Sequence, residues 1–326
     1  MKMKLLPALL LMFCMAACSN EKHENDEPVP GAGSRLEGVG FAFYGLDISV
    51  NEAPFREIVK SDYCNTFFVV GSHHTMDVIL AGLREIDKNK KTAWLNVAGS
   101  FYTFYGTHTV LNPDWKKNIS TIMDKIEEEG LMGSVRGIYF DEPFLWKIDK
   151  ESFMMVTKYF RETYTGKGIF VCFSVAEISP QLWKPEWPVV ELDQEIGKYL
   201  TDVAYDYYAD AQTEKQAFNT LTADMKRRMG RDDFKIWFVP CTMSYLGKTD
   251  EAYSIEHVNS LYRRLKIEKN PGGLACYTYY TIPKEIEPLG NIGLDQLLAP
   301  DNVNRWNNLD RLLQAVGKEI MAGQGN

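Results

Sequence analysis

The residues of this chain with the clearest chemical potential are the adjacent carboxylates Asp141 and Glu142, which precede Pro143. They follow the apolar run 137–140, and burial at such a place shifts pKa values. A carboxyl group beside another carboxylate has a raised pKa, as a general acid working near neutral pH requires. Neighbours in a strand point to opposite faces, so both can face one site only if the backbone turns there. Pro143 favours a turn, because proline ends strand pairing and holds the preceding Glu142 extended.

Other polar residues that follow apolar runs could complete such a site. With Glu142 as general acid and Asp141 as the orienting group, Tyr205 and Asp206 are candidates for supporting a charged intermediate. The candidates for substrate binding lie at the ends of apolar runs or in the segments that follow: Asp47, Asn96, Tyr102, Trp146, Tyr208 and Tyr279. The alternative interpretation of Asp141 and Glu142 is a structural pair that caps the next helix or meets a lysine.

Other catalytic chemistries find little support in the sequence. His73 and His74 are adjacent and diverge on an extended segment, and no HExxH spacing accompanies them, so we expect no metal. Ser100 and Ser174 lack a G-x-S-x-G context, which disfavours a serine hydrolase. We expect no cofactor.

Strands and helices must alternate to position these residues. Strands are expected at 39–48, 66–71, 92–98, 136–141, 168–175, 202–207, 234–240 and 273–279. Helices are expected near 52–61, 75–88, 114–129, 150–164, 191–199, 212–229, 251–266 and 302–319. This alternation predicts an α/β fold, a single (β/α)8 TIM barrel, whose active site lies at the carboxyl ends of the strands. An open doubly wound sheet is the alternative, but it usually carries a glycine-rich phosphate turn, and no GxGxxG or GxxxxGK[ST] occurs here.

Three short motifs resemble those of the family 18 chitinases and endo-β-N-acetylglucosaminidases, which are (β/α)8 glycoside hydrolases. The run 137–142 is similar to their Gly-Ile-x-x-Asp-x-Glu motif, in which Glu is the general acid. Segments 203–206 and 96–99 are similar to their Met-x-Tyr-Asp and Ser-x-Gly-Gly motifs. The resemblance implies glycan hydrolysis with Glu142 as the acid.

The chain departs from this pattern in its carboxylates. Asp141 and Glu142 are adjacent, whereas the family spaces its Asp and Glu by two, and Tyr139 stands where the family has an earlier Asp. Adjacent Asp and Glu are similar to the family 20 hexosaminidases, and the pair with its proline also resembles the Asn-Glu-Pro of clan A retaining glycosidases. Clan A needs a nucleophilic Glu after its seventh strand, and segment 236–242 has none, which argues against a two-carboxylate retaining mechanism. The resemblance implies a substrate-assisted mechanism, with Asp141 orienting an acetamido group. Inversion with Asp206 or Asp47 as the base stays open.

We therefore expect a glycoside hydrolase that acts on a β-linked glycan, and the resemblance implies an N-acetylhexosamine-containing one. Aromatic residues make up 13% of the chain, and their rings can stack on the apolar faces of sugars. The alternative function is a catalytically inactive barrel that binds glycan at the cell surface. A net charge of −8 without a basic cluster disfavours nucleic-acid binding. We expect a monomer.

The N-terminus predicts export and a lipid anchor. Lys2 and Lys4 precede a short apolar run that is too short to span a bilayer, and small residues precede Cys18. The segment 15–18 resembles the bacterial lipobox, which implies a signal peptide at 1–17 and lipid on Cys18. Residues 18–35 lack apolar periodicity and predict a flexible tether, whose acidic run is similar to the export signal of Bacteroidetes surface lipoproteins. The barrel domain is then 36–326, held to the outer membrane by lipid alone, on its periplasmic or outer face.

Overall fold

The computed structural model describes residues 36–70, 76–183, 185, 187–208, 211–245, 249–281 and 291–324, with the backbone alone at 70, 211–216 and 245. Cys18, the expected signal peptide and tether, and the His73–His74 pair lie outside the described residues.

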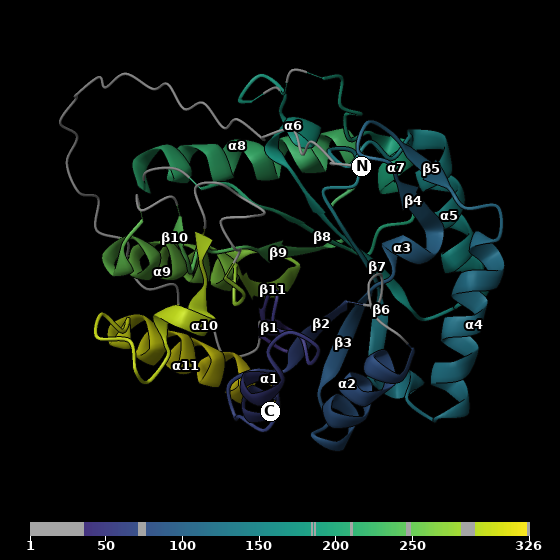
Figure 1. The fold of residues 1–326 in the computed structure, drawn as a ribbon. Coiled ribbons are helices and arrows are strands. Elements are labelled where there is room, and N and C mark those ends of the chain that lie inside the picture. The colour runs from purple at the N-terminus through teal and green to yellow at the C-terminus, as the bar shows by residue number, and fades with distance from the viewer. Residues whose placement is uncertain are drawn as a thin grey trace, which may run out of the picture.

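Eight parallel strands form one nearly closed barrel (Figure 1). In chain order they are β1 (Gly40–Phe43), β2 (Thr66–Val70), β3 (Thr92–Asn96), β6 (Val135–Asp141), β7 (Gly168–Phe173), β8 (Asp202–Tyr205), β9 (Lys235–Phe238) and β11 (Pro271–Cys276). Hydrogen bonding runs in the order β1-β11-β9-β8-β7-β6-β3-β2. At the remaining seam, the Asn65 side chain accepts from the Phe41 amide at 2.8 Å and donates to the Val39 carbonyl at 3.0 Å.

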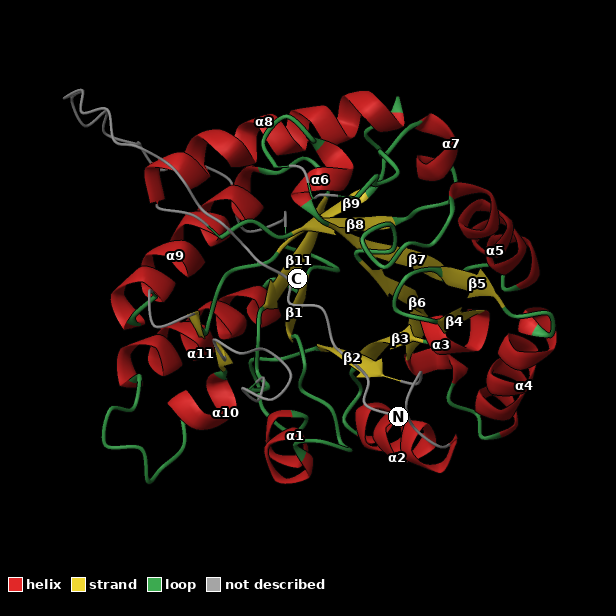
Figure 2. Cartoon of the chain, turned by 45° about the horizontal axis from the view of Figure 1, so that its top comes forward, coloured by secondary structure: helices red, strands yellow, loops and turns green. Residues whose placement is uncertain are grey.

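Helices surround the strands as an outer ring (Figure 2). The main ones are α1 (Glu52–Ile58), α2 (Met76–Lys88), α4 (Trp115–Glu128), α5 (Lys150–Thr163), α7 (Gln194–Gly197), α8 (Ala211–Met229), α9 (Glu251–Ile267) and α11 (Asn307–Ala322). The predicted (β/α)8 class is therefore confirmed. None of the described helices is both long enough and apolar enough to cross a membrane.

Eight short elements in the described part of the chain are not among the strands and helices expected from the sequence. They are α3 (Ala98–Phe101), β4 (Tyr102–Phe104), β5 (Thr109–Leu111), η2 (Met132–Ser134), α6 (Val175–Ile178), β10 (Ser244–Tyr245), β12 (Asn291–Ile292) and α10 (Leu294–Leu297). Several lie in loops that follow the carboxyl ends of strands, where a barrel places its functional groups. The antiparallel pair of β4 and β5, residues 102–111, is called the hairpin below.

Side chains that alternate along the strands fill the barrel. The inner cluster mixes large aromatic rings with small residues: Ala42, Phe68, Trp94, Tyr139, Phe170, Cys172, Ala204, Trp237, Val239 and Ala275. Residues at the alternate positions face the helices and join a much larger outer core. This alternation decides which residue of each strand end reaches the barrel mouth.

Candidate active site

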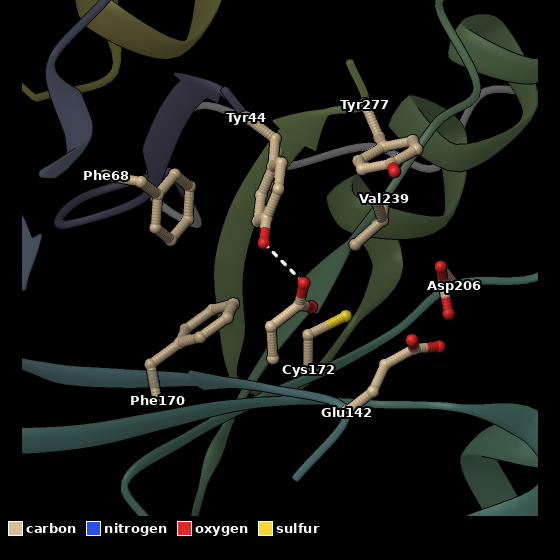
Figure 3. Close-up of a pocket in the computed structure, with 10 residues that line it drawn as sticks. Tyr44, Phe68, Glu142, Phe170, Cys172, Asp206, Val239 and Tyr277 are labelled. Atoms are coloured by element: carbon tan, nitrogen blue, oxygen red, sulfur yellow. Dashed lines mark hydrogen bonds between the residues drawn. The ribbon is translucent and has the colours of Figure 1, made fainter. Parts of the chain in front are cut away.

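A pocket of about 40 Å³ opens at the carboxyl ends of the strands (Figure 3). Its walls are three carboxylates, two tyrosines and a set of apolar or weakly polar side chains: Asp141, Glu142, Asp206, Tyr44, Tyr277, Phe68, Phe170, Cys172, Val239 and Ala275. Figure 3 shows the Glu142 and Asp206 carboxylates pointing into the same space beside Cys172. The pocket is the open end of the inner cluster, so the barrel filling forms its floor.

A backbone turn at Glu142 brings both adjacent carboxylates to this pocket. Asp141 ends β6, and Glu142 has a φ of +41°, in the left-handed region that side chains other than glycine rarely adopt. This conformation costs about 1–2 kcal/mol. The turn is therefore present, but the expectation that Pro143 holds Glu142 extended is wrong. The Glu142 amide donates to the Cys172 carbonyl at 2.7 Å, which fixes the turned segment to β7.

Asp141 is held by a chain of tyrosine hydroxyls. The Tyr44 hydroxyl donates to the Asp141 carboxylate at 2.5 Å, and the Tyr139 hydroxyl donates to the Tyr44 oxygen. Burial raises the pKa of Asp141, while the hydrogen bonds from the two tyrosines oppose that rise. The tyrosines thus favour the ionised form of Asp141 over what its burial alone would allow.

The further causes that act on the pKa of Glu142 differ from those at Asp141. Burial raises its pKa well above the usual range, and the negative charges of Asp206, Asp141 and Glu177 raise it further. Burial and the charge of Asp141 also raise the pKa of Asp206 to about 7. Among the described residues, no lysine, arginine or histidine forms an ion pair with any of these acids. Burial and these negative charges therefore favour the protonated form of Glu142.

Glu177 stabilises the segment that follows Glu142. Its buried carboxylate accepts from the amides of Phe144 at 2.7 Å and Leu145 at 3.1 Å, and from the amide of Ser174 at 2.6 Å. Burial raises the pKa of Glu177 to about 8, and these backbone donors oppose the rise. Because one side chain links the segments after β6 and β7, Glu177 fixes the shape of the turn at Glu142.

The described residues give other chemistries little support. No group of three or more His, Cys, Asp or Glu residues among them could hold a metal ion. The Cys172 thiol lines the pocket, but burial and the surrounding negative charges raise its pKa well above the usual range. A thiol that stays protonated is a poor nucleophile.

The pocket gathers several residues singled out from the sequence. Asp141, Glu142 and Asp206 all line it. The Tyr208 ring stacks on the pocket residue Tyr277, with centroids 5.8 Å apart and planes 15° apart. Three carboxylates and an aromatic stack therefore come from the ends of β6, β8 and β11, although they are distant in the sequence.

Tyr205 does not reach the pocket, contrary to expectation. It neighbours Asp206 in sequence but points to the other face of β8, because side chains alternate along a strand. Its buried hydroxyl donates to the Phe218 carbonyl at 3.2 Å and lies 2.6 Å from the Thr222 hydroxyl, both on α8. Tyr205 is thus a contact between the barrel and its helix layer.

All six expected substrate-binding residues lie outside the pocket lining, and four of them have structural contacts elsewhere. The Asp47 carboxylate accepts from the Ser49 amide at 2.9 Å and from its hydroxyl, forming a local turn. The Asn96 side chain accepts from the Ala98 amide at 3.3 Å, where α3 begins. Tyr102 and Tyr279 are buried in the outer core, where Tyr102 packs on Phe101 and Tyr279 on Phe43. Local turn formation and packing account for all four.

Trp146 is exposed, on the segment after β6. Its indole is 58% accessible, and its amide donates to the Glu142 carbonyl at 3.1 Å. It lies outside the pocket lining but is linked to the turn that forms one wall.

Seven of the ten pocket residues are not among the expected site residues, and two of the seven are tyrosines. Tyr44 and Tyr277 follow Ala42 and Ala275 by two positions, so the alternation that turns those alanines inward turns the tyrosines into the mouth. The sequence signal is the two-residue period, which identifies them once one inward-facing residue of each strand is known.

The arrangement places two adjacent carboxyl groups in one pocket, with different causes acting on their pKa values. Environments that separate the protonation states of neighbouring carboxyl groups are typical of acid–base catalysis. Here the tyrosines favour the carboxylate form of Asp141, and burial among negative charges favours the protonated form of Glu142. Such a site can protonate a leaving group while it stabilises a developing positive charge.

Comparison with known proteins shows the fold. No model of a known protein family and no curated protein matches the sequence. A candidate alpha-L-fucosidase from Bacteroides thetaiotaomicron is similar in structure, with a TM-score of 0.52 and 12% identity over 91% of this chain and 99% of that chain. The GH2 beta-galacturonidase from Eisenbergiella tayi has a TM-score of 0.51 and 9% identity over 81% of this chain. This chain spans about half (47%) of the length of that enzyme.

These similarities are at the level of architecture. Both structures carry names of glycoside hydrolases, and both share the barrel seen here. Because one barrel fold hosts many chemistries, function has to be argued from the residues of the site. The chain is therefore a TIM barrel of the architecture that glycoside hydrolases use, with a carboxylate pocket at its mouth.

Proposed function

We propose that the protein is a glycoside hydrolase in which Glu142 is the general acid. The observation that carries the proposal is the pairing of Glu142 with Asp141 in one pocket at the barrel mouth, where negative charges add to burial in raising the pKa of Glu142 and tyrosine hydrogen bonds oppose the rise at Asp141. Glycosidic bonds need this combination, since the leaving oxygen must be protonated while positive charge develops on the sugar.

In the proposed reaction Glu142 donates its proton to the glycosidic oxygen as the bond from that oxygen to the sugar breaks. The bond's electron pair leaves with the oxygen, and Asp141, oriented by Tyr44 and Tyr139, stabilises the positive charge that forms on the sugar. Water then adds to the sugar carbon, and its proton passes to a carboxylate of the pocket. Glu142, which has just given up its proton, is one candidate for that role. Asp206 faces the same space and is the other.

The proposed substrate is a β-linked glycan, with N-acetylhexosamine-containing glycans as the first to test. An acetamido group on the sugar would replace an enzyme nucleophile, in keeping with the absence of a Glu in segment 236–242. The aromatic walls formed by Tyr44, Phe68 and Tyr277 suit the apolar face of such a group.

The test compares the wild type with Glu142→Gln on a panel of β-linked glycans and aryl glycosides. Gln has nearly the same shape as Glu but no proton to donate, so we expect cleavage to fall by about 100-fold or more. Ile267→Ala is the matched control, since Ile267 is an exposed residue at the end of α9 that precedes β11. Undiminished cleavage by Glu142→Gln would overturn the role of Glu142. Binding without cleavage by the wild type would favour the inactive glycan-binding barrel.

We also propose that the protein is exported and held at the outer membrane by lipid on Cys18. The lipobox-like segment 15–18 supports this location, which suits an enzyme that meets envelope or imported glycans. The test is Cys18→Ser in cells fed a radiolabelled fatty acid. We expect loss of label and release of the protein from the membrane fraction, whereas label on the variant would contradict the anchor.

A further inference from the structure

Exposed aromatic rings gather beside the pocket rather than inside it. On the hairpin, Phe104 is 41% exposed and Tyr105 60% exposed. On the segments after β6 and β7, Trp146 is 58% exposed and Trp187 39% exposed. Both the hairpin and these segments follow carboxyl ends of barrel strands, so the rings lie on the same end of the barrel as the pocket. We call these four residues the aromatic platform.

The platform is held in shape by contacts between its parts. The Phe104 and Trp146 rings meet edge to face, with centroids 6.2 Å apart and planes 76° apart. The Thr109 hydroxyl donates to the Trp146 carbonyl, and Lys147 donates from Nζ to the Gly106 carbonyl at 3.0 Å. The same Lys147 ammonium lies 5.5 Å from the centroid of the Trp187 ring. Rings held by such contacts, as those of Phe104, Trp146 and Trp187 are, lose little further entropy when a ligand stacks on them.

The platform is continuous with the turn that carries the proposed acid. The Trp146 amide donates to the Glu142 carbonyl, and the Trp146 carbonyl accepts from the hairpin. The backbone that aims Glu142 into the pocket therefore also carries the central ring of the platform. Trp146 is therefore the platform residue that has a direct backbone link to a pocket residue.

We propose that the aromatic platform is a binding site for the sugar units of a glycan chain that extends beyond the unit held in the pocket. This inference rests on the proposed function and specifies its substrate: a chain of several sugars rather than a single glycoside. Exposed aromatic rings marked by polar neighbours signal a binding surface. Sugars fit this one because their C–H faces stack on rings, while their hydroxyls can reach the polar side chains of Thr107 and His108, which are also exposed.

The experiment measures how glycan binding depends on chain length. Glu142→Gln serves as the non-cleaving background, and its affinity is measured for oligosaccharides of one to six N-acetylglucosamine units and, by affinity electrophoresis, for soluble xylan, mannan and β-glucan. The test variant adds Phe104→Ala and Trp146→Ala, and the control adds Ile267→Ala instead. We expect affinity to rise with chain length. The affinity of the test variant for the longest ligands should be about 10-fold lower, which is equivalent to the loss of one stacked ring.

The outcomes separate this inference from the proposed function. Affinity that does not rise with length, equal loss in test and control variants, or no binding to any of the glycans would overturn the platform. Length-dependent binding that the test variant loses, in a protein whose wild type cleaves nothing, would uphold the platform and refute the hydrolase. Circular dichroism of the test variant shows whether it is folded, and Trp146→Phe, which keeps a ring, should restore most of the lost affinity.

Discussion

The two ends of the barrel hold their charged groups in opposite ways. At the amino ends of the strands, the Arg136 guanidinium lies 5.3 Å from the ring centroids of both Trp94 and Trp237. The Trp237 indole donates to the Asp202 carboxylate at 2.8 Å, and the charge of Asp202 supports the pKa of Arg136 against its burial. Arg136 and Asp202 therefore each have a partner at this end.

At the mouth, Asp141, Glu142, Asp206 and Glu177 gather with no ion-pair partner among the described residues. Burial raises the pKa of all four carboxyl groups, and Glu142 also adopts a strained backbone conformation. At the amino ends of the strands, here called the closed end, the charged groups are arranged in a way that favours stability. At the mouth they are arranged in a way that lowers stability. Such departures persist where a site needs them for function. If the two ends differ in this way, substitutions at the mouth and at the amino ends of the strands should have different effects.

The largest expected effect is on activity at the mouth. Glu142→Gln should reduce kcat by about 10²–10⁴-fold, because general acid catalysis contributes that much. The same variant should be more stable than the wild type, increasingly so as pH rises. The raised pKa of Glu142 means that the folded chain binds more protons than the unfolded chain above pH 4 or so, and stability then falls with rising pH. Thermal unfolding at pH 5 and pH 8 measures this gap, and a destabilised variant at pH 8 would contradict the comparison.

The next effect is on stability at the closed end. Arg136→Met removes a buried cation while keeping an apolar stem, and it leaves Asp202 with one partner fewer. We expect a loss of about 2–4 kcal/mol in the free energy of unfolding, measured in urea. The pH profile of the remaining activity should not change. A displaced pH profile without destabilisation would show that this end also serves catalysis.

Glu177→Gln should affect both properties, since Glu177 is buried beneath the mouth. An amide in its place presents a donor to backbone amides that need an acceptor. We expect a loss of about 1–3 kcal/mol in unfolding free energy, with a lower kcat because the turn at Glu142 loosens. Glu177→Asp, which keeps the carboxylate on a shorter stem, is the matched comparison. Full activity in Glu177→Gln would contradict its positioning role.

The smallest expected effect is a shift in the pH dependence of kcat. The charge of Asp206 helps to raise the pKa of Glu142, after burial. Asp206→Asn removes that charge, so the pKa of Glu142 should fall and the alkaline limb of the kcat profile should move to lower pH. The rate measured at different pH values checks this, and an alkaline limb that stays in place or moves upward would count against the coupling.

The barrel could be predicted from sequence because strand formation leaves a local signal. The strands expected at 66–71 and 136–141 agree with β2 and β6 to within one residue at each end. The strand expected at 39–48 is shorter, because β1 ends at Phe43 and Gly45 turns the chain with a φ of +74°. The helix expected at 191–199 is shorter in the structure, where α7 covers only Gln194–Gly197. The Asp193 side chain caps the first amides of this helix.

The site was only partly predictable, because the tertiary structure decides whether a side chain at a strand end points into the barrel or towards the helices. Sequence shows that Tyr205 and Asp206 lie at a strand end, but not which of them points inward. In the structure Ala204 belongs to the inner cluster, which turns Tyr205 outward and brings Asp206 to the pocket. The same alternation of side chains along the strands places Tyr44 and Tyr277 in the mouth. The hairpin and its exposed rings leave still less local signal, since its two short strands pair only with each other.

The most direct test of the account is the protonation state of Glu142. Infrared difference spectra between the wild type and Glu142→Gln at pH 7 isolate the carboxyl band of this one residue. The account predicts that the wild type contributes the carbonyl band of a protonated carboxylic acid, which converts to carboxylate only on the alkaline side. A band from carboxylate alone at pH 7 would show that Glu142 has no proton to give, and the proposed general acid would be refuted.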